Sequence, residues 1–195
     1  MSVQKRYKCT IIGDQNVGKT SILNTYLDKS IRDVCSTLGI DFFTKTVLVK
    51  GNTVLMTLWD TAGAERFHSL THSYLRDSDI IIIVYDLSKR TSNLSYWLRR
   101  AEQHNPAIIG ILGNKNDLTI EYAEDLQDIL YPWSRQHVPF ITAHCSSRHQ
   151  KTVKSFFKRC LHELVKDEFT DLEKTEVPIV VSFRQKALKN GTCCS

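Results

Sequence analysis

The stretch TIIGDQNVGKTSIL, residues 10–23, decides the fold of this 195-residue chain. An apolar run leads into Gly-Asp-Gln-Asn-Val-Gly-Lys-Thr at residues 13–20, and a helical pattern follows it. These eight residues match G-x-x-x-x-G-K-[ST], a loop whose successive backbone N–H groups surround an anion. A strand before the loop and a helix after it are the context that this pattern requires. We therefore predict a phosphate-binding loop at the start of an α/β fold.

Each fixed position of this loop has a physical task. Gly13 and Gly18 allow backbone conformations that other residues avoid, and the positive end of the following helix attracts anions. Lys19 can reach the β- and γ-phosphates of a nucleotide as a point charge. The Thr20 hydroxyl is a hard oxygen ligand of the kind that Mg²⁺ prefers. The alternative is a chance Gly-rich turn, which would have no reason to lie between a strand and a helix.

The remaining sequence alternates strands with helices. Short apolar runs rich in β-branched residues predict strands, and the two strands around residues 50–52 form a hairpin. The strands are predicted at residues 7–13, 42–49, 53–60, 79–86, 107–114 and 139–144, and the helices at residues 19–27, 92–104, 121–137 and 152–165. This order predicts the fold of a P-loop NTPase. Its sheet has six strands, is mostly parallel with one antiparallel edge strand, and is flanked by helices.

The length fits one domain with a tail. We expect a domain over residues 1–166 and a flexible tail over residues 167–195, where the regular pattern fades. The apolar patch at residues 177–183 has the alternative of a final strand packed on the domain. The net charge of +5 contains no dense basic run, so we expect no nucleic acid polymer as a partner.

The six cysteines form no CxxC pair and no Cys/His metal pattern. The N-terminus lacks the apolar stretch of a signal peptide. We therefore expect a reducing compartment and free thiols. Cys9 and Cys160 lie in apolar surroundings and are predicted to be core residues.

The choice of nucleotide is predicted from Asn114, Lys115, Asn116 and Asp117, at the end of a predicted strand. A carboxylate can accept two hydrogen bonds from guanine, through N1–H and the exocyclic amine. Adenine offers neither donor, and a buried charge left unpaired costs about 1–3 kcal/mol or more. Ligands of this fold class bind at the carboxyl ends of the strands. An ordinary polar turn is the alternative, but this position favours a guanine site.

Two further segments are placed to sense the γ-phosphate. Asp60 ends a predicted strand and can hold Mg²⁺ through water, and the N–H of Gly63 can bond the γ-phosphate. Thr37 lies in the loop before Phe42 and can complete the Mg²⁺ shell.

These four motifs, in this order, resemble the Ras superfamily of small GTPases. LGIDF at residues 38–42, WDTAGAERF at 59–67, SYLRD at 73–77 and IVYDLS at 83–88 are similar to Rab sequences in particular. The resemblance covers about residues 7–165 and the last few residues. It implies a GTP-binding molecular switch that regulates membrane traffic, hydrolyses GTP to GDP and uses Mg²⁺.

The resemblance also implies roles for the matching residues. Switch segments are implied around Thr37 and from Asp60 to about Tyr74. Ser146, Ser147 and Arg148 resemble the guanine-loop motif SAK, with arginine in place of lysine. The implied nucleotide contacts are Gly13, Gln15, Asn16, Val17, Gly18, Lys19, Thr20, Ser21, Thr37, Asp60, Gly63, Asn114, Lys115, Asp117, Ser146, Ser147 and Arg148; the implied Mg²⁺ ligands are Thr20, Thr37 and Asp60; and the aromatic trio Phe42, Trp59 and Tyr74 would contact effectors, with core packing as the alternative.

The main departure from the family is at the catalytic position. Ala64 replaces the glutamine that orients the attacking water, and a methyl group cannot do this. With Lys19 and Thr37 as the remaining catalytic residues, we expect slow intrinsic hydrolysis. An activating protein that supplies arginine and glutamine in trans could restore turnover.

The chain ends in Thr-Cys-Cys-Ser, which is similar to the twin-cysteine ends of Rab proteins. The resemblance implies geranylgeranylation of Cys193 and Cys194, and stable anchoring takes two such lipid signals. Unmodified thiols are the alternative. We expect a cytoplasmic protein attached by this lipid to the cytosolic face of a membrane. The implied partners are effectors, an exchange factor, a GTPase-activating protein, a GDP-dissociation inhibitor and the prenylation machinery.

Two other functions compete with the switch. A GTP-bound interaction module with negligible hydrolysis is favoured by Ala64. An ATP-dependent kinase is disfavoured by the guanine motif and by the lack of a recognisable lid or acceptor motif.

Overall fold

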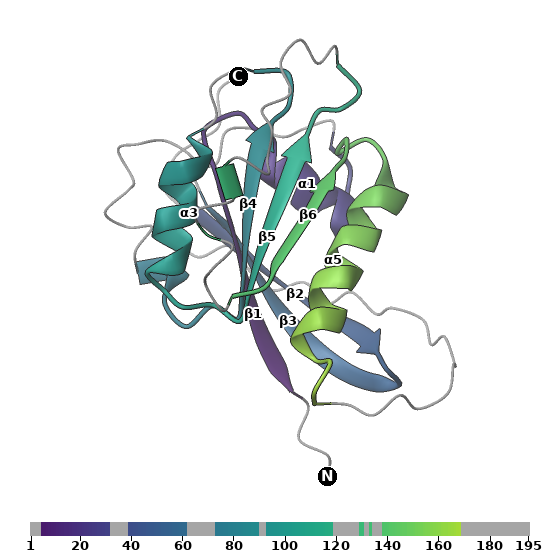
Figure 1. Ribbon diagram of the computed structural model, residues 1–195. Coiled ribbons are helices and arrows are strands. Elements are labelled where there is room, and N and C mark those ends of the chain that lie inside the picture. The colour runs from purple at the N-terminus through teal and green to yellow at the C-terminus, as the bar shows by residue number, and fades with distance from the viewer. Residues whose placement is uncertain are drawn as a thin grey trace.

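The fold is built on one sheet (Figure 1), seen in a computed structural model that describes residues 5–31, 39–61, 73–89, 93–118, 129–130, 133 and 138–168. Within these residues six strands run in the order β2-β3-β1-β4-β5-β6, and β2 alone is antiparallel to its neighbour. The strands are β1 (Arg6–Ile12), β2 (Ile40–Val49), β3 (Asn52–Thr61), β4 (Ile80–Asp86), β5 (Ile108–Asn114) and β6 (Phe140–His144). The prediction of a mostly parallel sheet with one antiparallel edge strand is confirmed.

The antiparallel edge comes from a two-residue hairpin. Val49 pairs with Asn52, so Lys50 and Gly51 form the turn, with φ angles of 49° and 74°. Two positive φ angles match the type I′ turn, whose twist fits the flanking strands. The predicted turn had included Asn52, which the structure places in β3.

Helices cover both faces of the sheet (Figure 1). The helices α1 (Lys19–Tyr26) and α5 (Gln150–Leu164) share one core cluster with alternate residues of β1 and β4, such as Ile11 and Ile82. The helix α3 (Leu94–Glu102) packs on the opposite face against Ile81 and Ile83. The strand β4 is buried along its whole length because side chains on both of its faces are covered. The helix predicted at residues 121–137 lies mostly outside the described residues.

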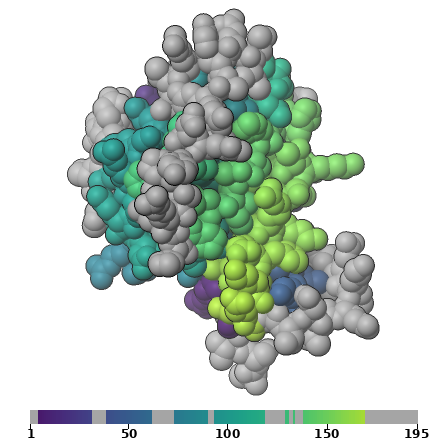
Figure 2. Space-filling view, viewed as in Figure 1, coloured from purple at the N-terminus to yellow at the C-terminus, as the bar shows by residue number. Residues whose placement is uncertain are grey.

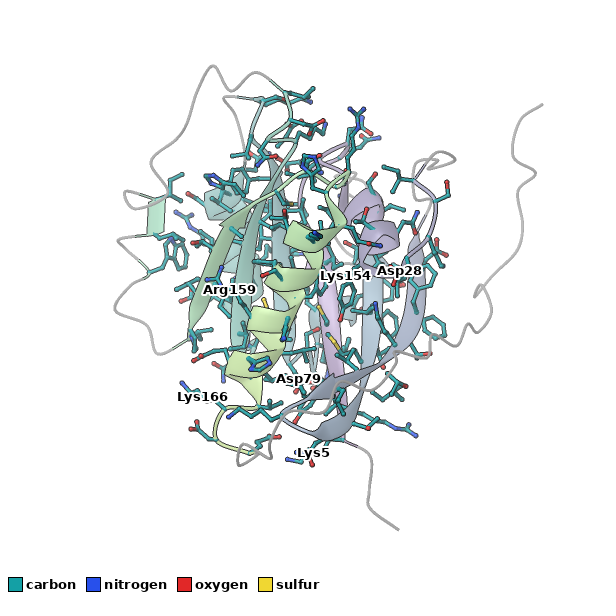
Figure 3. The ribbon with its side chains drawn as sticks, turned by 90° about the vertical axis from the view of Figure 1, so that its right-hand side faces the viewer. Lys5, Asp28, Asp79, Lys154, Arg159 and Lys166 are labelled. Atoms are coloured by element: carbon teal, nitrogen blue, oxygen red, sulfur yellow. The ribbon has the colours of Figure 1, made fainter. Side chains whose placement is uncertain are left out.

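The end of α5 lies next to the start of β1, as the yellow-green and purple surfaces show in Figure 2. Glu168 accepts hydrogen bonds from Lys5, at 2.6 Å, and from the Tyr7 hydroxyl. At the other end of α5, Lys154 forms an ion pair with Asp28 at 2.6 Å, and the two side chains face each other in Figure 3. The start of β1 is thus tied to the chain just after α5, and the first half of α5 is tied to the chain just after α1. The tail from residue 169 onward lies outside the described residues.

Three cysteines of the described part of the chain are buried and carry free thiols: Cys9, Cys145 and Cys160. The predicted core positions of Cys9 and Cys160 are confirmed. Burial raises the pKa of Cys160 to about 12, so its thiol stays protonated at neutral pH. No helix among the described residues is long and apolar enough to cross a bilayer.

Candidate nucleotide-binding site

The predicted phosphate loop connects the end of β1 to the start of α1. Gly13 and Gly18 both have positive φ angles, 140° and 95°. A Cβ on Gly13 would come within 2.1 Å of the Val84 carbonyl oxygen, and one on Gly18 within 2.4 Å of Asn114 Nδ2. Side chains at these positions would clash with β4 and with the end of β5. The glycines therefore let the loop lie directly against the carboxyl ends of the central strands.

The backbone of this loop is arranged to receive an anion. Asn16 and Gly18 have φ angles of 62° and 95°, and they alternate with residues of negative φ. Within the described part of the chain, the N–H groups of residues 15–18 donate to no main-chain carbonyl. Such an arrangement of N–H groups is an anion-binding nest. The loop therefore fits a phosphate group.

Lys19 lies beneath the loop with its ammonium group buried. Its side chain is 6% exposed, and Nζ donates to the carbonyls of Gly13 at 2.9 Å and Asp14 at 2.7 Å. Burial lowers the pKa of Lys19 to about 8, against the opposing effect of the nearby charges of Asp60 and Asp14. A buried cation held by two neutral carbonyls is suited to an anionic ligand that compensates its charge.

Two hard oxygen ligands meet beside Lys19. The hydroxyl of Thr20 donates to Asp60 Oδ2 at 2.5 Å, and Asp60 is fully buried near the end of β3. The register of the sheet places Asp60 beside Ile11 of β1, directly before the loop. An acidic oxygen and a hydroxyl next to a phosphate site are the donor set that suits Mg²⁺. These residues therefore fit a nucleotide bound with its metal ion.

Asn114 joins the phosphate loop to the predicted guanine loop. Its Nδ2 donates to the Val17 carbonyl at 2.8 Å, and its Oδ1 accepts from the N–H of Ser147 at 2.9 Å. The side chain is 1% exposed. One buried amide thus brings together three of the segments that sequence motifs had separately assigned to the nucleotide.

Lys115 has a partner that the sequence motifs did not reveal. Its ammonium lies 2.8 Å from Asp86 Oδ2, at the end of β4, and its backbone has a φ of 67°. Burial alone would raise the pKa of Asp86, but hydrogen bonds from Lys115 and Ser88 outweigh it and hold the pKa below its ordinary value. Asp86 lies opposite Asn114, the neighbour of Lys115, in the sheet register. In the sequence, the only signal for this ion pair was that Asp86 ends a predicted strand.

The expected base-binding carboxylate lies at the rim of the site. Ser146 holds the pKa of Asp117 below its ordinary value by a side-chain hydrogen bond, with a smaller contribution from Arg148. Arg148 Nη1 lies 3.2 Å from Asp117 Oδ2, and its side chain is 72% exposed. Ser146 is buried, and its hydroxyl also accepts from the N–H of Arg148. The Ser-Ser-Arg segment and Asp117 therefore lie next to each other.

The aromatic trio forms one cluster. The ring centroid of Trp59 lies 5.6 Å from that of Phe42 and 6.1 Å from that of Tyr74. Lys8 Nζ lies 5.0 Å from the Trp59 ring. All three aromatic residues are half-buried, and none belongs to either core cluster. This arrangement favours a surface role over the alternative of core packing.

The remaining predicted site residues divide into two groups. Gln15 and Asn16 are exposed on the phosphate loop, and Ser21 lies in the first turn of α1, where its carbonyl accepts from Thr25. The residues that lie outside the described part of the chain are Thr37, Gly63, Ala64, Cys193 and Cys194.

The chain is similar to a known protein family. A model described as the Ras family matches residues 8–166. Because the match covers most of the chain, this protein belongs to the Ras family. Members of this family are small GTPases that bind GTP and GDP, typically with Mg²⁺, and act as switches. The predicted superfamily is confirmed, and the Rab subgroup stays a prediction.

Proposed function

We propose that this protein is a Rab-type GTP-binding switch of vesicle and membrane traffic. The observation that carries the nucleotide assignment is the position of Asn114, which hydrogen-bonds both the phosphate loop and the loop beside Asp117. A nucleotide lying across this amide would have phosphate at Lys19 and its base at Asp117. The Rab subgroup is supported by the half-buried cluster of Phe42, Trp59 and Tyr74 and by the twin cysteines at the end of the chain.

The residues around the nucleotide would divide the work as follows. The nest of N–H groups and Lys19 bind the phosphates, and Thr20 and Asp60 hold Mg²⁺, with Thr37 as a further ligand. Mg²⁺ neutralises charge on the phosphates when it is bound. Asp117 accepts from guanine, and the side-chain hydrogen bond from Ser146, which lowers the pKa of Asp117, orients this carboxylate. The γ-phosphate then holds the segments around Thr37 and Gly63 in the conformation that effectors recognise.

We expect intrinsic hydrolysis to be slow because Ala64 cannot orient the attacking water. The test is single-turnover hydrolysis of preloaded GTP by the wild type and by Ala64→Gln. The variant is expected to hydrolyse GTP at least about tenfold faster, because a glutamine at this position can orient the attacking water. A Rab-directed activating protein that supplies its own glutamine is expected to narrow this gap. Equal rates of the wild type and Ala64→Gln in the absence of any activating protein would contradict the assigned role of position 64.

A second function is favoured by the same residue. If no activating protein restores turnover, this protein would act as a GTP-bound interaction module attached to a membrane. The hydrolysis assay separates the two functions, because the module would keep its GTP under every condition while still binding effectors.

Attachment to the cytosolic face of a membrane rests on Cys193 and Cys194. Each CH₂ group of a buried lipid chain contributes about 0.8 kcal/mol, and two chains give stable anchoring. By family resemblance, prenylation machinery would add these chains, and a GDP-dissociation inhibitor would extract the protein. Replacement of both cysteines by serine should move the expressed protein from the membrane fraction to the soluble fraction.

A further inference from the structure

Asp14, the second residue of the phosphate loop, is held from two sides. Its carbonyl accepts from Lys19 Nζ at 2.7 Å. Its carboxylate accepts from the first turns of α3: Trp97 Nε1 donates to Oδ1 at 2.8 Å, and Asn93 donates through its backbone N to Oδ2 at 3.2 Å and through Nδ2 to Oδ1 at 3.3 Å. Asp14 therefore connects the loop to a helix on the opposite face of the sheet from α1.

The main donor of this group has a fixed position. Trp97 is 3% exposed and packs in the core cluster that contains Leu94, Leu98 and Ile83. An indole N–H can donate a hydrogen bond but cannot accept one. The core thus fixes the direction of a donor that points at the Asp14 carboxylate. Asn93, in contrast, is exposed and adds its two donors from the position directly before the first residue of α3.

A carboxylate on a phosphate-binding loop needs such donors for an electrostatic reason. An unpaired negative charge there would repel the phosphates and could compete with them for Lys19. Three N–H donors on the α3 side disperse the charge of Asp14 and keep its oxygen atoms turned toward α3. The carbonyl of the same residue stays available to Lys19.

We infer that Trp97 and Asn93 are positioning residues for the phosphate loop, which hold the Asp14 carboxylate away from the bound phosphates and couple the start of α3 to the nucleotide. This inference rests on the proposed nucleotide-binding function. Its consequence is that loss of the Trp97 N–H speeds nucleotide release, although Trp97 itself touches no phosphate.

The test measures release of a fluorescent GDP analogue in the presence of Mg²⁺ from the full-length wild type, Trp97→Phe and Trp133→Phe. Phenylalanine keeps an aromatic ring in the core but lacks the N–H. Trp133 is the matched control because it packs against the same core cluster. Trp97→Phe is expected to release the nucleotide about tenfold faster, the usual effect of losing a hydrogen bond to a charged group. Trp133→Phe should stay within about twofold of the wild type.

A role confined to core packing is separated from this one by Asp14→Asn, which removes the charge but keeps an acceptor for Trp97. In a protein that already carries Asp14→Asn, the further change Trp97→Phe should speed release by less than about threefold. Asparagine has no negative charge, so its side chain would not repel the phosphates even when the Trp97 N–H no longer holds it toward α3. If Trp97→Phe does not fold, Asn93→Ala replaces it at an exposed position, with an expected acceleration of about threefold.

Equal acceleration by Trp97→Phe with and without the charge of Asp14 would overturn the inference, as would an unchanged release rate in both Trp97→Phe and Asn93→Ala. The failure of the proposed function looks different: the wild type would bind no guanine nucleotide in the first place.

Discussion

The two ends of the proposed nucleotide site hold their charges in opposite ways. At the phosphate end, Lys19 is 6% exposed and its ammonium is held by backbone carbonyls beneath a loop of backbone N–H groups. At the base end, Asp117 lies at the rim and pairs with Arg148, whose side chain is 72% exposed. Buried charges interact strongly and exposed ones weakly, because water and salt screen the latter. The comparison indicates that the phosphate end supplies most of the affinity and the base end supplies the selectivity.

The largest effect is expected from breaking the phosphate end. Lys19→Met removes the buried cation, so two carbonyls and the bound phosphates lose their partner. We expect the affinity for GDP with Mg²⁺ to fall by on the order of a thousandfold, as when one partner of a buried ion pair is removed. Calorimetric titration measures this loss. A fall of less than about tenfold would mean that the backbone nest, and not the buried charge, carries the affinity.

A smaller but more selective effect is expected at the base end. Asp117→Asn replaces one acceptor oxygen by a donor, so guanine loses a hydrogen bond and meets an opposing N–H group. The affinity for GDP should fall by about a hundredfold, near 2–3 kcal/mol. Xanthosine diphosphate carries a carbonyl in place of the exocyclic amine, so its affinity should fall much less than that of GDP. Competition of both nucleotides against a fluorescent GDP analogue measures the difference, and equal losses would argue against base recognition by Asp117.

The pH dependence of stability sharpens the account of Lys19. In the folded protein the pKa of Lys19 is about 8, below its ordinary value of 10.5. Between these values the unfolded chain binds more protons, so the contribution of Lys19 to stability rises with pH across this window. The cost of burying the charge is fully present below about pH 8.

Urea unfolding of the nucleotide-free wild type and Lys19→Met at pH 8 and pH 10 measures this contribution, since the buried thiols and tyrosines are common to both proteins. Between pH 8 and pH 10, the free energy of unfolding of the wild type should rise by about 1–2 kcal/mol relative to that of Lys19→Met. A difference independent of pH would show that Lys19 titrates normally.

The smallest effect is expected from Arg148→Ala. Exposed ion pairs contribute about 0–1 kcal/mol, so the affinity for GDP should change by no more than about threefold, and less at high salt. Lys115→Ala is the matched comparison, because Lys115 pairs with the buried Asp86 and should cost more. If Arg148→Ala were the more damaging of the two in the same titration, the proposed contrast between buried and exposed pairs would be wrong.

Most of the fold could be predicted from local sequence. The continuous apolar runs of β4 and β5 are typical of strands covered on both faces, and the structure buries every residue of both. The phosphate loop was predicted because its residues are consecutive, so their spacing carries the whole signal. The hairpin turn was predicted to within one residue, since Gly51 marks a position that favours positive φ.

The contacts that join the site together could not be predicted in this way. Trp97 and Asp14 are separated by 83 positions, and Asn114 and Val17 by 97, so their pairing depends on how the strands order in the sheet. Period-two patterning predicted that Phe42 and Trp59 lie on strands, but only the packed sheet shows that their half-buried rings stack across the paired strands β2 and β3. Local patterns thus predicted the elements and the motif residues, and tertiary packing decided which side chains meet.

The central claim is that a buried lysine and a nest of backbone N–H groups bind a Mg²⁺-bound diphosphate or triphosphate, with Asp117 selecting guanine. It is tested most directly by calorimetric titration of the nucleotide-free protein with GDP and with ADP, each in the presence of Mg²⁺. We expect GDP to bind at least about a hundredfold more tightly than ADP. Equal affinities for the two nucleotides, or no binding of either, would contradict the claim.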